Sequence, residues 1–363
     1  MTYPLVSADS HIIEPPDLWT KRIDKKYRDQ APRIVQDAEG AKFMTGKEAG
    51  GFFGGTHAAN TKPKTTRSRI EDVPKGAWDP DARVKDMEVD GVVAEVLYCT
   101  LAMRIFGYNN DPEYQAACFR AYNDWLGEYC SAHPNQLIGV ALISTVDIEE
   151  ATNELKRAAS LGLKGAAVSA YKSDDKNYGL PMYDPFWREA EHLGIPVSLH
   201  SYTGGQPMVA LNFLVDYSLA PHHMQRSLAF ITLGGVFERF PKLRVVSAEN
   251  DAGWAGHLLE RMDWAHERKG IRWGQPLKSL PSEQARSHVS YTFMRDAASV
   301  LTRDLVGVGN LMWCSDYPHD DCTWPDSREV VARQFKDISE GDRVKITCLN
   351  AARLYGIPVS QTN

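Results

Sequence analysis

Carboxylate and imidazole side chains that could bind a metal ion occur at four well-separated places in this sequence. They are Asp9-Ser10-His11, His200, Glu249 and Asp316, and each follows a short apolar run typical of a β-strand. In an αβ-barrel, the carboxyl ends of all the strands meet on one face, where the chemistry takes place. Four such ends would bring these side chains into one pocket. Imidazoles with carboxylates suit a divalent metal ion that keeps one coordination position open.

The first segment has the spacing of a ligand pair. Asp9 and His11 are two residues apart, and residues i and i+2 of an extended strand point the same way. The competing interpretation is that Asp9 caps a turn while His11 packs in the core. His200, taken alone, also fits a structural role, so its assignment depends on its agreement with the other strand ends.

Three side chains are candidates for proton transfer. Asp316 opens the segment Asp-Tyr-Pro-His-Asp-Asp, and because no helix follows at once, a functional role explains it better than helix capping. His319 could reach a substrate, or it could be an exposed loop histidine. Glu249 could carry protons or bind the metal ion, unless it forms a salt bridge in the barrel mouth. We therefore predict Asp316, Glu249 and His319 as catalytic residues.

Two further groups could support this site. Glu14 follows the first segment closely and could orient His11 through its free ring nitrogen. His222 and His223 precede the helix that leads to the sixth strand, and one of them could reach the substrate.

The elements that would position these residues alternate regularly along the chain. Short apolar runs predict eight strands, and 3.6-residue periodicity with Pro starts and Gly stops predicts helices between them. The predicted strands cover residues 5–8, 92–97, 137–142, 165–168, 196–199, 243–248, 289–292 and 311–315. The predicted helices lie within residues 79–90, 111–132, 148–161, 184–193, 221–240, 254–267, 297–306 and 327–354. This order implies parallel pairing. We predict one (β/α)8 TIM barrel over residues 1–363.

Residues 15–80 interrupt this alternation. They are rich in Pro, Gly, Lys and Thr and lack regular periodicity, which predicts a long insertion after strand one. Such long loops are usually functional or disordered. The insertion's place after the first strand would put it over the catalytic face, as a lid or as an arm that contacts another subunit.

Composition excludes several other classes of protein. The 363 residues are 43% hydrophobic and 24% charged, which is typical of a soluble globular protein, and a net charge of −6 argues against a nucleic-acid partner. No apolar run reaches the ~18 residues of a membrane span. The six cysteines lack C-x-x-C spacing and the first residues do not resemble a signal peptide, so we expect a cytoplasmic protein with reduced thiols. Phosphate-loop, dinucleotide and G-x-S-x-G motifs do not occur.

Several motifs together resemble one known group of proteins. The carrying segments are residues 9–15, 78–92, 199–200, 234–243 and 314–319, including Gly-Gly-Val-Phe-Glu-Arg-Phe-Pro-Lys-Leu and Cys-Ser-Asp-Tyr-Pro-His. The chain resembles the amidohydrolase-related group that includes aminocarboxymuconate-semialdehyde decarboxylase and the resorcylate and carboxyvanillate decarboxylases. The resemblance implies a divalent metal ion, with zinc as the first candidate and manganese as the second. It places the metal ligands on Asp9, His11, His200 and Asp316.

The sequence departs from that group at two positions. Asp9 stands where the group usually has His or Glu, and Glu249 stands where its decarboxylases have a catalytic histidine. An aspartate can still bind a metal ion, so the first change leaves the predicted site intact. The second change bears on the reaction, because the missing histidine is the group's expected proton carrier.

Three functions follow from these observations. The leading hypothesis is a metal-dependent carbon–carbon lyase that removes CO₂ from a small aromatic or unsaturated carboxylic acid. The alternative is a hydrolase or hydratase that uses a metal-activated water, and the third is a barrel that binds without catalysis. The lyase would use a cationic clamp for the substrate acid, for which the candidates are Arg67, Arg69 and Arg104. The large insertion predicts a homodimer or a higher even oligomer.

Overall fold

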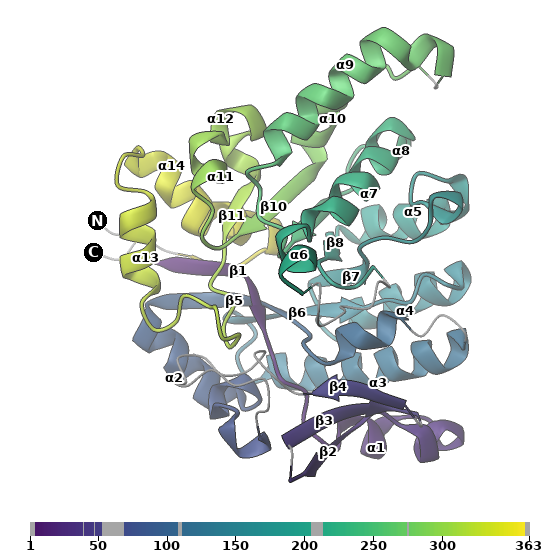
Figure 1. Cartoon of the computed structure of the whole chain (residues 1–363), viewed down its shortest axis with the longest axis vertical. Helices are drawn as coiled ribbons and strands as arrows, with labels where there is room; N and C mark the ends of the chain where they lie inside the picture. The colour runs from purple at the N-terminus through teal and green to yellow at the C-terminus, as the bar shows by residue number, and fades with distance from the viewer. Residues whose placement is uncertain are drawn as a thin grey trace.

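The computed structural model describes residues 4–38, 40–46, 48–52, 69–107, 111–204, 213–273 and 276–359. Its main sheet has eight parallel strands that neighbour each other in sequence order, with helices packed around them (Figure 1). The strands are β1 (Leu5–His11), β5 (Val92–Tyr98), β6 (Leu137–Leu142), β7 (Gly165–Ser169), β8 (Val197–His200), β9 (Val245–Ala248), β10 (Val289–Phe293) and β11 (Leu311–Trp313). The predicted (β/α)8 barrel is confirmed.

The first and last strands meet through the segment that directly follows β11. The amide of Asp316 donates a hydrogen bond to the carbonyl of Asp9 at 3.1 Å, and the amide of His11 donates to the carbonyl of Tyr317 at 2.7 Å. These backbone bonds join the two ends of the sheet. They also hold two of the predicted site segments side by side.

The strands are buried on both faces, which explains why they appear in the sequence as continuous apolar runs. Val6, Val140, Val168, Leu199 and Val246 are all fully buried. They form part of one continuous hydrophobic core that extends from the barrel interior to the surrounding helices. This core fixes the strand ends from which the site is built.

The capping and glycine residues seen in the sequence lie at the ends of the helices. The side chain of Asp79 accepts a hydrogen bond from the amide of Ala82 at the start of α2, and Gly91 ends that helix in the left-handed conformation. The main helices are α2 (Pro80–Asp90), α3 (Pro112–Ser131), α4 (Ile148–Ser160), α5 (Asp184–Leu193), α7 (Pro221–Leu233), α8 (Val236–Arg239), α9 (Ala255–Trp273), α11 (Ala297–Leu301) and α12 (Arg303–Val306).

Some helices differ from the prediction. Gly234 and Gly235 split the expected 221–240 helix into α7 and α8, because Gly235 adopts a left-handed conformation. The 297–306 helix is likewise two short helices. Helices α6 (Phe213–Ser218) and α10 (Pro281–His288) were not predicted. The tail contains α13 (Ser327–Gln334), α14 (Glu340–Val344), a π-helical turn η8 (Lys345–Leu349) and α15 (Asn350–Tyr355) rather than two helices.

The insertion after β1 contains regular structure, which its lack of sequence periodicity did not predict. Helix α1 (Leu18–Arg22) and the 3-10 turn η1 (Lys25–Gln30) precede an antiparallel sheet of β2 (Arg33–Asp37), β3 (Gly40–Thr45) and β4 (Glu48–Phe52). This sheet lies near α1 and α3 (Figure 1). In β3, Ala41, Phe43 and Thr45 are buried, whereas Lys42 and Met44 between them are half-buried, as expected for a sheet with one face on the core.

The insertion is attached to the barrel through α3. The indole Nε1 of Trp19 donates to the carbonyl of Cys118 at 3.0 Å, and Arg22 forms an ion pair with Glu128 at 2.6 Å. Residues 53–68, which include Phe53 and Arg67, lie outside the described residues. The role of the insertion as a lid or subunit arm stays a prediction, as does the assignment of residues 1–363 to a single domain.

All six cysteines are buried free thiols. Within the described ranges, no helix combines the length and the apolar character needed to cross a membrane.

Candidate metal centre

Five buried polar atoms from four strand ends converge at the barrel mouth. They are Asp9 Oδ1, His11 Nε2, His200 Nε2, Glu249 Oε2 and Asp316 Oδ1, and none has a hydrogen-bond partner among the described residues. The Nε2 atom of His11 lies 3.6 Å from Asp9 Oδ1, 3.5 Å from Glu249 Oε2 and 3.3 Å from Asp316 Oδ1. Because buried polar atoms without partners are costly, their convergence indicates a position for a cation.

The imidazole of His200 completes the cluster from β8. The Nε2 atom of His200 lies 3.1 Å from Glu249 Oε2 and 3.7 Å from Asp9 Oδ1. The donor atoms of Asp9, His11 and His200 all lie within 4.8 Å of one another, as do those of His11, Asp316 and His319. Two imidazole nitrogens with several carboxylate oxygens fit a divalent metal ion.

The structure therefore brings together all four residues that were predicted as ligands. Asp9 and His11 both point inward from β1, as their i, i+2 spacing predicts. His200 is the last residue of β8, and Asp316 follows β11 in the segment that is bonded to β1. The assignment of these residues as metal ligands stays a prediction.

The second nitrogen of each imidazole is held by the backbone. The Nδ1 atom of His11 lies 2.7 Å from the carbonyl oxygen of Cys99, and that of His200 lies 3.0 Å from the carbonyl oxygen of Ser201. A carbonyl can only accept, so each Nδ1 must carry the proton. Each Nε2 atom therefore faces the centre and can bind an ion there when it carries no proton, which is the arrangement of a metal-binding histidine.

Glu14 does not orient His11, so that prediction was wrong. Its two carboxylate oxygens accept hydrogen bonds from the amides of Leu101 and Ala102, each at 2.9 Å. Glu14 thus joins the end of β1 to the turn η4 (Ala102–Gly107). The position expected for Glu14 is occupied instead by the Cys99 carbonyl, which residue types alone do not reveal.

Two of the five residues have an unusual backbone conformation. Glu249 and Asp316 have φ angles of 53° and 60°, in the left-handed region that non-glycine residues rarely adopt. The amide of Glu249 is held by the hydroxyl of Thr292 at 2.9 Å, and that hydroxyl donates to Asp9 Oδ2 at 3.0 Å. Strained residues held by their surroundings are concentrated at functional sites.

Burial and mutual repulsion control the protonation of the carboxyl groups. Burial raises the pKa of Glu249 to about 8, and the carboxylates of Asp316 and Asp9 contribute to the rise while His200 opposes it. Burial, with Asp321 and Asp9, also raises the pKa of Asp316 well above its usual range. These carboxyl groups therefore hold protons unless a cation compensates their charge.

His319 lies next to this cluster and is also buried. Its ring stacks on that of His11 with a centroid separation of 4.0 Å, and its Nδ1 lies 3.1 Å from Asp316 Oδ2. Its Nε2 lies 3.5 Å from the hydroxyl of Thr100. His319 is thus buried and paired with Asp316, which excludes the interpretation as an exposed loop histidine.

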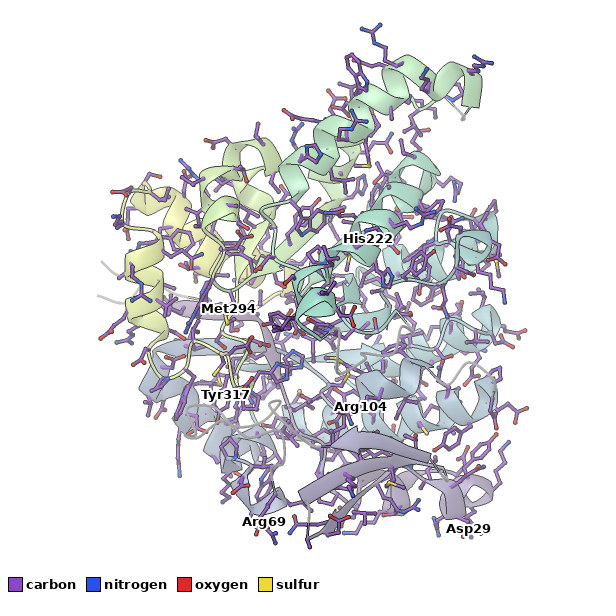
Figure 2. The ribbon with its side chains drawn as sticks, viewed as in Figure 1. Asp29, Arg69, Arg104, His222, Met294 and Tyr317 are labelled. Carbon is purple, nitrogen blue, oxygen red and sulfur yellow. The ribbon has the colours of Figure 1, made fainter. Side chains whose placement is uncertain are left out.

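The remaining residues that were predicted to contact the substrate are not part of this cluster. Arg69 is exposed, forms an ion pair with Glu71 and lies at the outer edge of the molecule (Figure 2), so it is wrongly placed for a clamp at the metal centre. Arg104 is half-buried in η4 and lies farther inward (Figure 2). His222 is exposed, and the ring of His223 stacks on that of Tyr171 at 4.9 Å.

A buried ion pair behind β1 supports the centre and was missed by the sequence analysis. The Nε atom of Arg83 lies 2.5 Å from Glu95 Oε2, and its Nη1 donates to the carbonyl of His11 at 2.8 Å. Its Nη2 donates to the carbonyl of Tyr317 at 3.2 Å. The sequence could have indicated this pair through Glu95, because a charged residue inside an apolar strand needs a buried partner.

Comparisons with known proteins agree with this geometry. A family model described as amidohydrolase matches residues 55–357. The gamma-resorcylate decarboxylase of a Rhizobium species is 24% identical over 327 residues, covering 81% of this chain and 94% of the relative. An amidohydrolase from Mycobacterium avium subsp. paratuberculosis has a similar structure, with a TM-score of 0.83, 22% identity and 99% of each chain covered. A dihydroxybenzoic acid decarboxylase from Polaromonas with bound manganese has a TM-score of 0.68 and 17% identity, covering 98% of this chain and 97% of that one.

Proposed function

The chain belongs to the amidohydrolase family, and from this premise we propose that it is a metal-dependent decarboxylase of a small aromatic or unsaturated carboxylic acid. The observation that carries the proposal is the convergence of five unpartnered buried atoms, which fits a divalent metal ion. The related Rhizobium protein, which aligns over most of its length, is a decarboxylase. A carboxy-lyase activity is therefore the function that the site supports best.

In this proposal, Asp9, His11, His200 and Asp316 would hold the metal ion. When bound, the ion supplies a Lewis acid that polarises a substrate oxygen. The four residues lie on β1, on β8 and just after β11. They would therefore hold the substrate in a fixed orientation relative to the barrel.

Glu249 would supply the proton. Its carboxyl group faces the proposed ligands, and burial favours its protonated form. The bond between the ring or chain carbon and the carboxylate breaks, its electron pair stays on that carbon, and CO₂ leaves. The proton of Glu249 then forms the new C–H bond, and its side chain, which is 24% exposed, regains a proton from solvent. His319, which pairs with Asp316 and stacks on His11, would take part in this proton transfer.

A hydrolase or hydratase is the second candidate, and Glu249 is the observation that favours it. A carboxylate in this position can handle the protons of a metal-activated water at least as well as an imidazole can. Asp316 would then take the proton of the water, and Glu249 or His319 would protonate the leaving group.

The identity of the metal ion, the oligomeric state and the cellular location are proposed from the sequence. Zinc and manganese remain the two candidates, because both accept imidazole and carboxylate ligands. We further propose a homodimer or a higher even oligomer in the cytoplasm, for which the large insertion and the composition are the support. Light scattering on the purified protein tests the oligomer.

The deciding experiment measures bound metal in wild type, His200→Ala and Asp316→Ala, with His257→Ala as control. His257 is exposed on α9, so its replacement removes an imidazole without touching the centre. We expect about one zinc or manganese per chain, lost in the first two variants and kept in the control. The loaded protein is then tested for CO₂ release from hydroxybenzoates and for hydrolysis of amides and lactones. A folded wild type that binds no metal after reloading would refute both enzyme proposals and leave a binding barrel.

A further inference from the structure

One buried hydroxyl joins two residues of the centre that have different proposed roles. The hydroxyl of Thr292, on β10, donates a hydrogen bond to Asp9 Oδ2 at 3.0 Å and accepts one from the amide of Glu249 at 2.9 Å. Thr292 is fully buried, so solvent does not compete for these two bonds. The hydroxyl therefore links a proposed metal ligand directly to the proposed proton donor.

The direction of both bonds follows from the chemistry of the three groups. An amide can only donate, so Thr292 Oγ1 accepts from Glu249, and its single proton is left for the carboxylate of Asp9. Threonine is also branched at Cβ, which restricts rotation about χ1. The hydroxyl is thus held in one orientation by its two partners and by the shape of its own side chain.

The bond from Thr292 determines which oxygen of Asp9 faces the centre. With Oδ2 bonded, Oδ1 is the oxygen that lies 3.6 Å from His11 Nε2 and 3.7 Å from His200 Nε2. This Oδ1 atom is buried and has no hydrogen-bond partner among the described residues. Rotation about the last torsion of an aspartate is only weakly restricted by the side chain itself. Without the proton of Thr292, the carboxylate would be free to turn.

The second bond acts on the backbone of Glu249. Its φ angle of 53° is sparsely populated by residues other than glycine, and such a conformation persists only where the surroundings hold it. From this backbone, the side chain reaches to 3.1 Å from His200 Nε2 and 3.5 Å from His11 Nε2. Release of the amide would allow Glu249 to relax and would move its carboxyl group.

The link also connects strands that do not pair with each other. In the sheet order, β10 and β11 lie between β9, which Glu249 follows, and β1, which carries Asp9. Thr292 is paired with Met312 of β11, and the segment after β11 is bonded to β1. A displacement on the Glu249 side can therefore reach Asp9 through one side chain.

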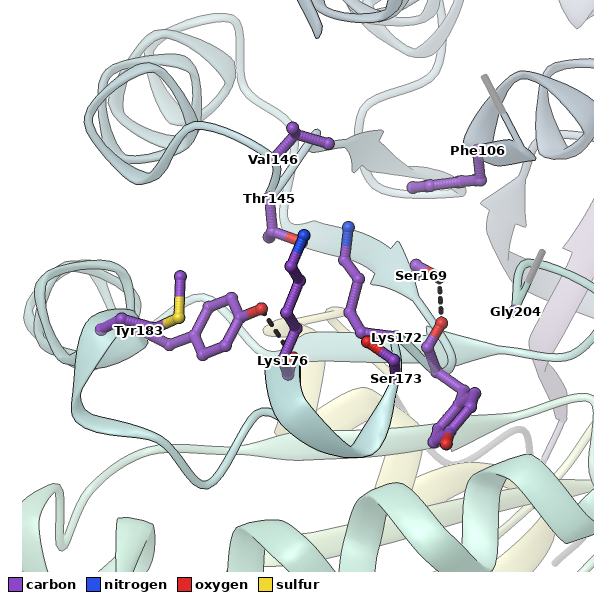
Figure 3. Close-up of a pocket in the computed structure, with 11 residues that line it drawn as sticks. Phe106, Thr145, Val146, Ser169, Lys172, Ser173, Lys176, Tyr183 and Gly204 are labelled. Atoms are coloured by element: carbon purple, nitrogen blue, oxygen red, sulfur yellow. Dashed lines mark hydrogen bonds between the residues drawn. The ribbon is translucent and has the colours of Figure 1, made fainter. Parts of the chain in front are cut away.

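A second buried threonine shows the difference between this link and an ordinary backbone contact. The hydroxyl of Thr203 donates to the carbonyl of His200 and accepts from the amide of Ala170, each at 2.6 Å. It ties β8 to the segment after β7, where Ser169 lines a cavity of about 370 Å³ (Figure 3). Both partners of Thr203 are backbone atoms, whereas Thr292 bonds a side-chain oxygen of the centre.

We propose that Thr292 is a positioning residue that holds Asp9 for metal binding and Glu249 for proton transfer. The inference rests on the proposed function, because the roles of Asp9 and Glu249 come from it. These are the two positions at which the sequence departs from the related decarboxylases. Thr292 would thus make the two departures depend on each other.

Metal affinity tests the bond to Asp9. Thr292→Val keeps the branched shape and removes the hydroxyl, whereas Thr292→Ser keeps the hydroxyl. The metal-free proteins are titrated with zinc chloride and, separately, with manganese chloride in a calorimeter. We expect Thr292→Val to bind about 10–100-fold more weakly than wild type, the usual cost of removing a group that orients a metal ligand. Thr292→Ser should bind nearly as tightly as wild type.

The chain offers a matched control for the loss of a buried hydroxyl. Thr232 is also fully buried and lies on α7, and its hydroxyl has no hydrogen-bond partner in the part of the chain that the structure describes. Thr232→Val should keep the affinity of wild type. Thr292→Ala, which also lacks the hydroxyl, is measured in parallel in case Thr292→Val fails to fold, and circular dichroism verifies the fold of each variant.

The rate of CO₂ release at saturating metal tests the bond to Glu249. Thr292→Val should lower kcat by up to about 100-fold, the cost of misplacing a reacting group, and should leave KM nearly unchanged. In a Glu249→Gln background the same substitution should cause no further loss, because Thr292 would act through Glu249. Losses that multiply would show another route and would overturn this part of the proposal.

Unchanged metal affinity in a folded Thr292→Val would refute the role at Asp9, and so would an equal loss in Thr292→Ser. The titrations do not depend on turnover. Wild type that binds metal but releases no CO₂ would instead count against the proposed decarboxylation, while the titrations would still decide the role at Asp9. The two failures are therefore distinguishable.

Discussion

Among single residues, Glu249 determines which chemistry the centre can perform. It faces His11 and His200, and burial raises the pKa of its carboxyl group. We expect Glu249→Gln to lower the rate of CO₂ release by about 10²–10⁴-fold, the usual contribution of a general acid. Bound metal should stay close to one per chain, because the four proposed ligands remain. Stopped-flow assays together with elemental analysis check both outcomes.

His319 provides the comparison for that experiment. It contacts Asp316 and the ring of His11, so its proposed role is to support proton transfer, and we expect His319→Asn to slow the reaction less than Glu249→Gln does. The opposite order, with a nearly normal rate in Glu249→Gln, would make His319 the proton donor and would remove Glu249 from the mechanism.

Between elements, the contacts of Arg83 join α2, β5, β1 and the segment after β11. Arg83 and Glu95 are both buried, so removal of one partner leaves an unpaired charge in the core. We expect Arg83→Met to destabilise the fold by about 3–5 kcal/mol and to weaken metal binding, since the carbonyls of His11 and Tyr317 lose their donor. Denaturant unfolding and metal titration measure the two effects.

Two further variants test this interpretation. The double variant Arg83→Met with Glu95→Gln should recover part of the lost stability, because it removes the unpaired charge. Arg22→Met breaks an ion pair whose Glu128 side chain is 64% exposed, and it should cost less than about 1 kcal/mol. If Arg83→Met were as stable as Arg22→Met, the pair would not support the centre.

The elements also explain what the sequence could and could not predict. Strands such as Leu137–Leu142 are buried on both faces, so their apolar runs are visible in the sequence and end at the correct residues. The strands Arg33–Asp37 and Gly40–Thr45 are only partly buried, so neither contains the continuous apolar run that identifies a strand of the barrel. Asp9, His11, His200 and Asp316 were predicted because each comes at or just after the end of an apolar run in the sequence. The Cys99 carbonyl that holds His11 could not be predicted, because a backbone oxygen leaves no signal in the residue types.

For the whole molecule, the centre connects the first and last strands of the barrel. Asp9 and His11 lie on the first strand, Asp316 follows the last, and His200 lies on β8 between them. A bound ion would therefore join strands that are otherwise held by backbone bonds such as Asp316 to Asp9. It would also neutralise carboxyl groups whose pKa values burial has raised. Both effects favour the folded chain over the unfolded chain.

Removal of the metal should consequently lower the thermal stability of the entire barrel. With free metal ion at about 100 times its Kd, binding contributes about 2.7 kcal/mol, which corresponds to a fall of several degrees in Tm on chelation. Calorimetry of the loaded protein with and without EDTA at one pH measures this fall. His200→Ala should show a lower Tm that EDTA does not change, because the ion is already absent. If chelation removed the ion from wild type without changing Tm, the ion would not join the strands, and closure of the barrel would depend on its backbone bonds alone.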